Sequence, residues 1–159
     1  MVIEDQPAWA PHLRSRSRVR SSPKRHFVDP SLAAAVMRVT PERLLQDVNL
    51  LGLLFESMVI RDLRVHAQAQ DAQVLHYRDN TGLEVDAIVE RADGAWGAFE
   101  VKLGTTHIEE AADNLRTFAE RVDTTKCGPP RELGVITGFG PGYRREDGID
   151  VIPIGAVSA

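Results

Sequence analysis

The chain has 159 residues and a formal net charge of −4 at pH 7, and 43% of its residues are hydrophobic and 26% charged. This length is enough for one domain with a buried core, and the composition is that of a soluble globular protein. No apolar run approaches the roughly 18 residues that a membrane span requires, so we expect no membrane partner. The single cysteine, Cys127, excludes an intramolecular disulfide and a cysteine-based zinc site. The first residues lack the basic-then-apolar order of a secretory signal, which favours the cytoplasm.

Positive charge is concentrated near the amino terminus. Between His12 and His26 the cationic residues, with no acid among them, are Arg14, Arg16, Arg18, Arg20, Lys24 and Arg25. We therefore expect residues 1–26 to form an extended basic arm or connector, and residues 27–159 to form one domain. Two interpretations of the arm remain open. It either neutralises nucleic-acid phosphates, or it is solvated or docked on a partner protein.

Helical patterns follow the arm. Asp29 or Ser31 can cap a short helix over residues 32–37, and Thr40-Pro41 is a typical helix start. The pattern then runs to about residue 66, with a break predicted near residues 47–49. Its apolar stripe is predicted to be core and consists of Val48, Leu51, Phe55, Met58 and Val65. Glu56 has only uncharged neighbours three and four residues away, so it either borders a polar site or is exposed beside a second packed surface.

Strand patterns begin after this helix. We predict strands over residues 74–78, 83–89 and 96–102, a helix over about 107–122, and strands over 133–137 and 149–154. Asp93-Gly94 lies between the second and third strands and indicates a β-hairpin. The order α-β-β-β-α-β-β predicts an α/β layered domain with a central mixed sheet.

The predicted hairpin carries the most informative polar residues. Glu100 and Lys102 must point to the same face of their strand, and Asp86 lies on the neighbouring strand. Two carboxylates and an ammonium in one hydrated cluster suit Mg²⁺, which prefers a few carboxylates plus waters and phosphate oxygens. The alternative is an ordinary surface hairpin with solvated charges.

The order of these motifs resembles the PD-(D/E)xK nuclease-like superfamily, which includes restriction endonucleases and Holliday junction resolvases. The resemblance rests on a helix acid, Glu-Val-Asp on one strand and Phe-Glu-Val-Lys on the next. It implies a restriction-endonuclease-like α-β-β-β-α-β fold, with Mg²⁺ or Mn²⁺ held by Glu56, Asp86 and Glu100, and Lys102 as the catalytic lysine. Val85 stands where the superfamily's name has a proline.

A closer resemblance covers most of the chain. It rests on the runs Ser22–Ala33, Gly52–Val59, Tyr77-Arg78, Gly82–Asp86, Glu100–Lys102 and Val151–Ile154. These are similar to the domain of unknown function 4143, found at the carboxyl end of many bacterial and archaeal AAA-type ATPases. The resemblance implies a detached or truncated carboxyl-terminal half, which either stands alone or works with a separate AAA-type ATPase chain as partner. No G-x-x-x-x-G-K-[ST] motif is present, and Pro141 interrupts the only glycine-rich stretch, so no ATP site is expected.

Three functional hypotheses follow. The first is a metal-dependent phosphodiesterase acting on DNA, in which the basic arm, Arg144 and Arg145 contact backbone phosphates. The second is a non-catalytic, regulatory module that binds nucleic acid or an ATPase partner. The third is a remnant of a truncated gene. The five histidines show no H-E-x-x-H or similar spacing, which argues against a zinc hydrolase.

Overall fold

The computed structural model describes residues 3–11 and 22–157. Its helices are α1 (Pro30–Val36), α2 (Pro41–Gln46), α3 (Val48–Ala69), α4 (Ile108–Arg121) and α5 (Thr124–Cys127), followed by a 3-10 turn at Ile154–Ala156. Its strands are β1 (Ile3–Gln6), β2 (Lys24–Phe27), β3 (Ala72–Arg78), β4 (Glu84–Arg91), β5 (Trp96–Lys102), β6 (Glu132–Thr137), β7 (Tyr143–Arg144) and β8 (Asp150–Pro153). Among these elements, no helix has the length and apolar character needed to cross a membrane.

Six of the strands form one mixed sheet in the order β3-β4-β5-β6-β8-β7. Strands β3, β4 and β5 form an antiparallel meander, β5–β6 and β6–β8 are parallel, and β7 returns antiparallel to β8. The α/β class and the central mixed sheet predicted from the sequence are therefore confirmed.

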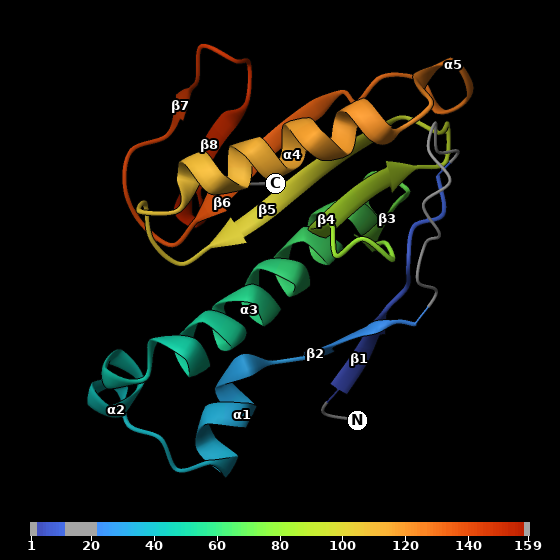
Figure 1. The fold of residues 1–159 in the computed structure, drawn as a ribbon. Coiled ribbons are helices and arrows are strands. Elements are labelled where there is room, and N and C mark those ends of the chain that lie inside the picture. Colours follow the sequence, from blue (N-terminus) through green and yellow to red (C-terminus); the bar gives the residue numbers. More distant parts are fainter. Residues whose placement is uncertain (1–2, 12–21, 158–159) are drawn as a thin grey trace.

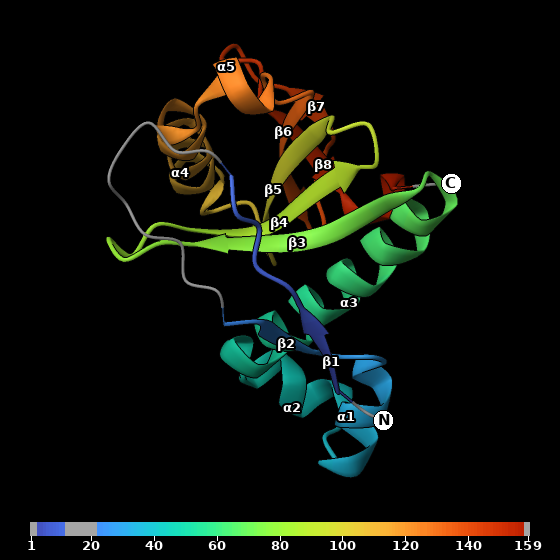
Figure 2. The same ribbon diagram turned by 90° about the vertical axis from the view of Figure 1, so that its right-hand side faces the viewer.

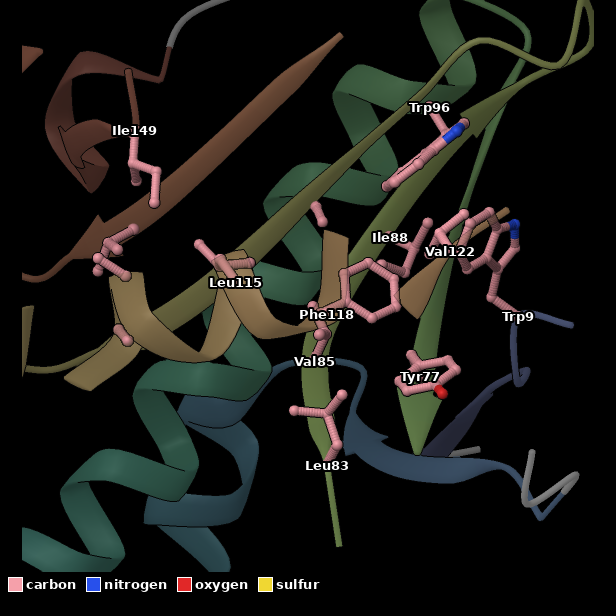
Figure 3. Close-up of a cluster of buried hydrophobic side chains, with 14 of the residues drawn as sticks. Trp9, Tyr77, Leu83, Val85, Ile88, Trp96, Leu115, Phe118, Val122 and Ile149 are labelled. Carbon is pink, nitrogen blue, oxygen red and sulfur yellow. The ribbon is translucent and has the colours of Figure 1, made fainter. Parts of the chain in front are cut away.

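Helices cover both faces of the sheet (Figures 1 and 2). The face under α4 holds the larger core, in which Tyr77, Trp96 and Phe118 are almost fully buried (Figure 3). On the opposite face α3 packs Phe55 and Val59 against the sheet. Polar residues on β4 and β5 can therefore reach solvent mainly where the two strands emerge from between these helices.

Local signals placed the first helices correctly. The Asp29 carboxylate accepts a hydrogen bond from the Ser31 amide at the start of α1, and the Thr40 hydroxyl accepts one from the Arg43 amide at the start of α2. Asp47 ends α2 and caps α3 by accepting from the Leu50 amide, so the predicted break near residue 47 is confirmed.

The predicted core stripe of α3 is wrong at two positions. Val48 is 63% exposed and Val65 is 62% exposed. The first turns of α3 lie with α1 and α2 beyond the end of the sheet, so Val48 has no strand to pack against (Figure 1). Farther along, the helix turns Val59 and Ile60 toward the sheet, which leaves Val65 facing solvent.

Part of the predicted basic arm belongs to the fold. Strands β1 and β2 form a two-stranded antiparallel ribbon, in which Gln6 pairs with Lys24. After β1 the chain runs beside β3, where the Trp9 amide donates a hydrogen bond to the His76 carbonyl at 2.7 Å. The Trp9 ring enters the core under α4. The arginines at positions 14, 16, 18 and 20 lie outside the described residues.

Candidate functional site

The β4–β5 hairpin brings Asp86, Glu100 and Lys102 to one end of the sheet. Asp93-Gly94 forms its turn, in which Gly94 has a φ of 81° and the Arg91 amide donates to the Ala95 carbonyl at 2.9 Å. A φ of this sign is readily adopted by glycine. Pairing runs from Glu90↔Trp96 to Ala87↔Phe99. Asp86 precedes Ala87 on β4, and Glu100 comes after Phe99 on β5. The two acids therefore lie beside each other, just beyond the last pair of the hairpin.

A β-bulge at Asp86 directs its side chain toward β5. Leu75 pairs with Ile88 and Tyr77 with Val85, so β4 has one more residue than β3 between these pairs. A bulge bends the strand and reorients a side chain. Here Asp86 Oδ2 accepts a hydrogen bond from the Val101 amide at 3.0 Å. The carboxylate thus bonds to β5 directly beyond the Ala87↔Phe99 pair and is fixed next to Glu100.

Glu100, at 4% exposed, is more buried than the other two predicted metal-binding acids, Glu56 and Asp86. Its Oε2 lies 3.0 Å from Lys102 Nζ, and its Oε1 accepts a hydrogen bond from Asn114 Nδ2 of α4 at 2.8 Å. Burial, and then repulsion from Asp86, raise the pKa of Glu100 to about 7, although Lys102 and Asn114 act in the opposite direction. The charge of the Glu100 carboxyl group therefore changes near neutral pH.

Lys24 of β2 lies at the centre of a second group of carboxylates. Its Nζ is 2.6 Å from Glu56 Oε1, 3.2 Å from Glu84 Oε1 and 3.3 Å from Asp86 Oδ1. Burial alone would lower the pKa of this ammonium, but attraction to Asp86 and then to Glu56 raises it above its usual value. Lys24 is therefore firmly protonated and neutralises part of the cluster.

Glu56 reaches this group from α3. Burial, and then repulsion from Asp86, raise the pKa of Glu56, and Lys24 partly compensates. Because Glu56 and Asp86 both contact the same Lys24 nitrogen, their oxygens cannot be farther apart than the sum of those two contacts. The structure thus brings together all four residues predicted from the motifs, with Asp86 as the link between Glu56 and the Glu100–Lys102 pair.

A cavity of about 500 Å³ opens beside these residues. Its polar lining consists of Glu84, Asp86, Glu100, Lys102, Glu110, Asp113, Asn114 and Thr117. Five of these groups are acids and one is a lysine, so the cavity attracts cations. A slightly larger cavity, of about 560 Å³, lies near the carboxyl end of α3 and contains none of the predicted site residues. The acidic cavity, which contains the predicted site residues, is therefore a better candidate for the functional site than the larger cavity.

The donors at this site suit a hard cation, because Mg²⁺ and Mn²⁺ prefer carboxylate oxygens. Among residues 3–11 and 22–157, however, no group of three or more His, Cys, Asp and Glu side chains is arranged so that it could hold a metal ion. The Lys24 ammonium contacts one oxygen of each of the Glu56, Glu84 and Asp86 carboxylates. The carboxylates are suitable ligands for Mg²⁺ or Mn²⁺, but in this structure the Lys24 ammonium lies between them.

The described cationic residues that were predicted to contact nucleic acid differ in their exposure to solvent and in how closely acids hold them. Lys24 points into the carboxylates, and the exposed Arg25 lies 3.6 Å from Asp5. Arg144 is exposed and bonds to Asp150. Arg145 is held by Glu109 at 2.6 Å and by Asp147 at 3.1 Å. Of these four, only Arg25 and Arg144 present largely exposed guanidinium groups.

Sequence reasoning missed three residues of the site. Glu84 lies two positions before Asp86 on the same strand, and alternation alone could have indicated it. Asn114 donates to both Glu100 Oε1 and the Glu84 carbonyl, at 2.8 and 2.6 Å. Its place on the inner face of α4 carried no special signal. Lys24 was assigned to the basic arm, for which contact with nucleic-acid phosphates was one of two interpretations, because most charged residues near it in the sequence are arginines.

Comparison with known proteins identifies the family. The model of the family Domain of unknown function (DUF4143) matches residues 51–157, and the chain belongs to this family. The matched region contains Glu56, Asp86, Glu100 and Lys102, whereas Lys24 precedes it. No curated protein and no solved structure matches the chain.

Proposed function

We propose that the domain is a metal-dependent nuclease of the PD-(D/E)xK type that hydrolyses phosphodiester bonds of DNA. The observation that carries this proposal is the convergence of Asp86, Glu100 and Lys102 on one cavity, with Glu56 linked to Asp86 through Lys24. The element order α3-β3-β4-β5-α4-β6 also agrees with the restriction-endonuclease-like layering that we propose for the fold.

The residues have separate roles in this proposal. Glu56, Asp86 and Glu100 would hold Mg²⁺ or Mn²⁺, which when bound polarises a phosphodiester and lowers the pKa of a bound water. The Val101 amide fixes Asp86, and Asn114 fixes Glu100. The Lys102 ammonium, 3.0 Å from Glu100, is placed to stabilise negative charge on a phosphate that enters the cavity.

The cellular context is part of the same proposal. We infer a cytoplasmic protein that works with a separate AAA-type ATPase chain, and this inference is supported by the family resemblance. The acidic cavity makes cation binding a requirement for approach of a phosphate, because like charges repel at close range.

The test is cleavage of plasmid and junction DNA by the full chain with Mg²⁺ or Mn²⁺. We expect Asp86→Asn and Lys102→Gln each to lower the cleavage rate by a factor on the order of 100, as the loss of one stabilising group commonly does. Asp71→Asn, at the turn before β3, and Lys126→Gln, on α5, are matched controls and should retain activity. Cleavage that survives both site substitutions would show that these residues are not the catalytic site.

One observation favours a second candidate, a non-catalytic module that binds nucleic acid or an ATPase partner. Lys24 already neutralises part of the carboxylate group, so the fold does not depend on a metal to hold these acids together. This candidate predicts DNA or ATPase binding that is insensitive to Mg²⁺ and unaffected by Lys102→Gln. Metal-dependent cleavage by the wild-type chain would exclude it.

A further inference from the structure

We propose that Lys24 is the resident cation of this site, and that its ammonium and a divalent metal ion exclude each other. This inference rests on the metal-binding role proposed above and adds a control element to it. Lys24 lies on the β2 strand, outside the region matched by the family model. The inference therefore assigns a function to the amino-terminal ribbon, which contains none of the four predicted catalytic residues Glu56, Asp86, Glu100 and Lys102.

The first argument is spatial. The Lys24 nitrogen lies 2.6, 3.2 and 3.3 Å from single oxygens of Glu56, Glu84 and Asp86, so it occupies the volume between three carboxylates. A Mg²⁺ ion needs contacts of about 2.0–2.1 Å to its oxygen ligands. An ion coordinated by the Glu56 and Asp86 oxygens that contact Lys24 would compete with the ammonium for the lone pairs of the same two atoms. The two cations therefore compete for one set of carboxylates.

The second argument is electrostatic. Three carboxylates contact one ammonium, and Arg78 lies 3.7 Å from Glu84, which still leaves an excess of negative charge. The neighbouring cavity adds Glu100, Glu110 and Asp113 against Lys102. The site therefore still attracts a further cation while Lys24 is bound, and a divalent ion compensates the excess better than a lysine does. The two cations would repel each other strongly at this range, which makes exchange the expected outcome rather than joint occupancy.

The third argument concerns how Lys24 can leave. Gln6 Nε2 donates to the Leu75 and Asp86 carbonyls, both at 2.9 Å, and Gln6 Oε1 lies 2.8 Å from His26 Nε2. Together with the buried Trp9, these bonds fix the ribbon backbone to β3 and β4. The Lys24 side chain is 27% exposed, so it has a path to solvent. Displacement therefore requires rotation of one flexible side chain and leaves the ribbon in place.

The direct test is Mn²⁺ binding by the full chain, measured by calorimetry at about pH 8. We expect Lys24→Gln to bind Mn²⁺ about tenfold more tightly than the wild type, since one neighbouring charge typically changes an ionic equilibrium by one or more orders of magnitude. Lys126→Gln makes the same chemical change on α5 and should bind as the wild type does. Adding Asp86→Asn to Lys24→Gln should remove the gain. Equal Mn²⁺ affinities of Lys24→Gln and the wild type would overturn the proposal.

A second measurement needs no substitution and so remains decisive if Lys24→Gln does not fold. Reductive methylation of the wild-type lysines is followed by mass spectrometry with and without saturating Mn²⁺. We expect Mn²⁺ to accelerate modification of Lys24, because displacement exposes the amine and removes its carboxylate partners. Lys126 serves as the internal control. An unchanged or slower rate at Lys24 contradicts the exchange.

These outcomes separate the inference from the nuclease proposal. Tighter Mn²⁺ binding by Lys24→Gln without DNA cleavage by any form would support the exchange and refute the nuclease. Metal-dependent cleavage that requires Asp86, together with unchanged Mn²⁺ affinity in Lys24→Gln, would support the nuclease and refute the exchange.

Discussion

Glu100 combines burial with two polar partners, and this makes its charge sensitive to pH. Its carboxyl is bonded by Lys102 and Asn114 and lies near Asp86. Removing an acidic group from water favours its neutral form, and a nearby carboxylate has the same effect. A proton can therefore reside on Glu100 in the folded protein at a pH where the same group is ionised in the unfolded chain.

The first prediction concerns Glu100→Gln and its effect on stability as pH changes. The pKa of Glu100 is raised from 4.5 to about 7 in the folded state, so its contribution to stability is full below about pH 4.5 and is lost as pH rises through 7. Glutamine cannot ionise. Between about pH 5 and pH 8, the free energy of unfolding should therefore fall in the wild type relative to Glu100→Gln, by an amount on the order of 2 kcal/mol.

Urea denaturation of both proteins at several pH values measures this difference. Glu56, whose pKa is also raised, and His26, whose pKa burial lowers to about 4, are present in both proteins, so their contributions cancel. A difference between the two proteins that stays constant from pH 5 to pH 8 would contradict the raised pKa of Glu100.

At the level of elements, the amino-terminal segment connects the core to the site. Trp9 is 4% exposed, its ring centroid lies 4.9 Å from that of Trp96 and 5.9 Å from that of Phe118, and its Nε1 donates to Glu90 Oε1 at 3.0 Å (Figure 3). The same segment continues from β1, which pairs with the strand that carries Lys24. Packing of Trp9 thus contributes to both the stability of the domain and the position of Lys24.

The second prediction is that Trp9→Ala lowers the free energy of unfolding by about 3–5 kcal/mol, the range typical of a buried aromatic residue replaced by alanine. Chemical denaturation measures the change. Val36→Ala is the control, because Val36 is exposed on α1, and it should change stability by less than about 0.5 kcal/mol. A loss below about 1 kcal/mol for Trp9→Ala would show that the segment does not belong to the cooperative fold.

The sequence predicted those elements whose signals are local. The β4–β5 hairpin follows from a glycine turn between two alternating runs, and α4 follows from helical periodicity. From the hairpin alone, Asp86, Glu100 and Lys102 could be placed together. Glu56 required the family resemblance, because no local rule says which side of a helix meets a distant strand.

The ribbon could not be predicted by the same rules. Strands β1 and β2 have four residues each, are largely polar and pair across a long intervening segment. Their stability comes from contacts with the rest of the fold, such as the Gln6 bonds to Leu75 and Asp86. Lys24 was therefore grouped with its basic neighbours in sequence, whereas its partners are acids on α3 and β4. The prediction that Val48 belongs to the core was wrong for a related reason. Helical periodicity shows which side of a helix is apolar, but it does not show where the sheet under that helix ends.

Across the whole molecule, the basic amino-terminal stretch and the candidate site carry opposite charges. The stretch from His12 to His26 has six cationic residues and no acid, while the rest of the chain is strongly acidic and surrounds the site with carboxylates. Lys24 and Arg145 are held by acids in the described part of the chain. If the domain binds DNA, we therefore expect most of the attraction to come from the four arginines at positions 14, 16, 18 and 20, with smaller contributions from the exposed Arg25 and Arg144.

The last prediction is that these four arginines determine the salt dependence of DNA binding. Each phosphate neutralised by a cationic side chain contributes about −0.9 to the slope of log K against log salt for duplex DNA, so replacing all four arginines by glutamine should reduce the slope by roughly 3 to 4. Fluorescence anisotropy with a DNA duplex between about 50 and 200 mM salt measures the slope. Arg43→Gln combined with Arg91→Gln changes exposed arginines on α2 and at the hairpin turn, and should leave the slope nearly unchanged. An equal loss of slope per replaced arginine in the two variants would show that binding responds to total charge rather than to the arm. The absence of wild-type binding at low salt would contradict the DNA-binding role itself.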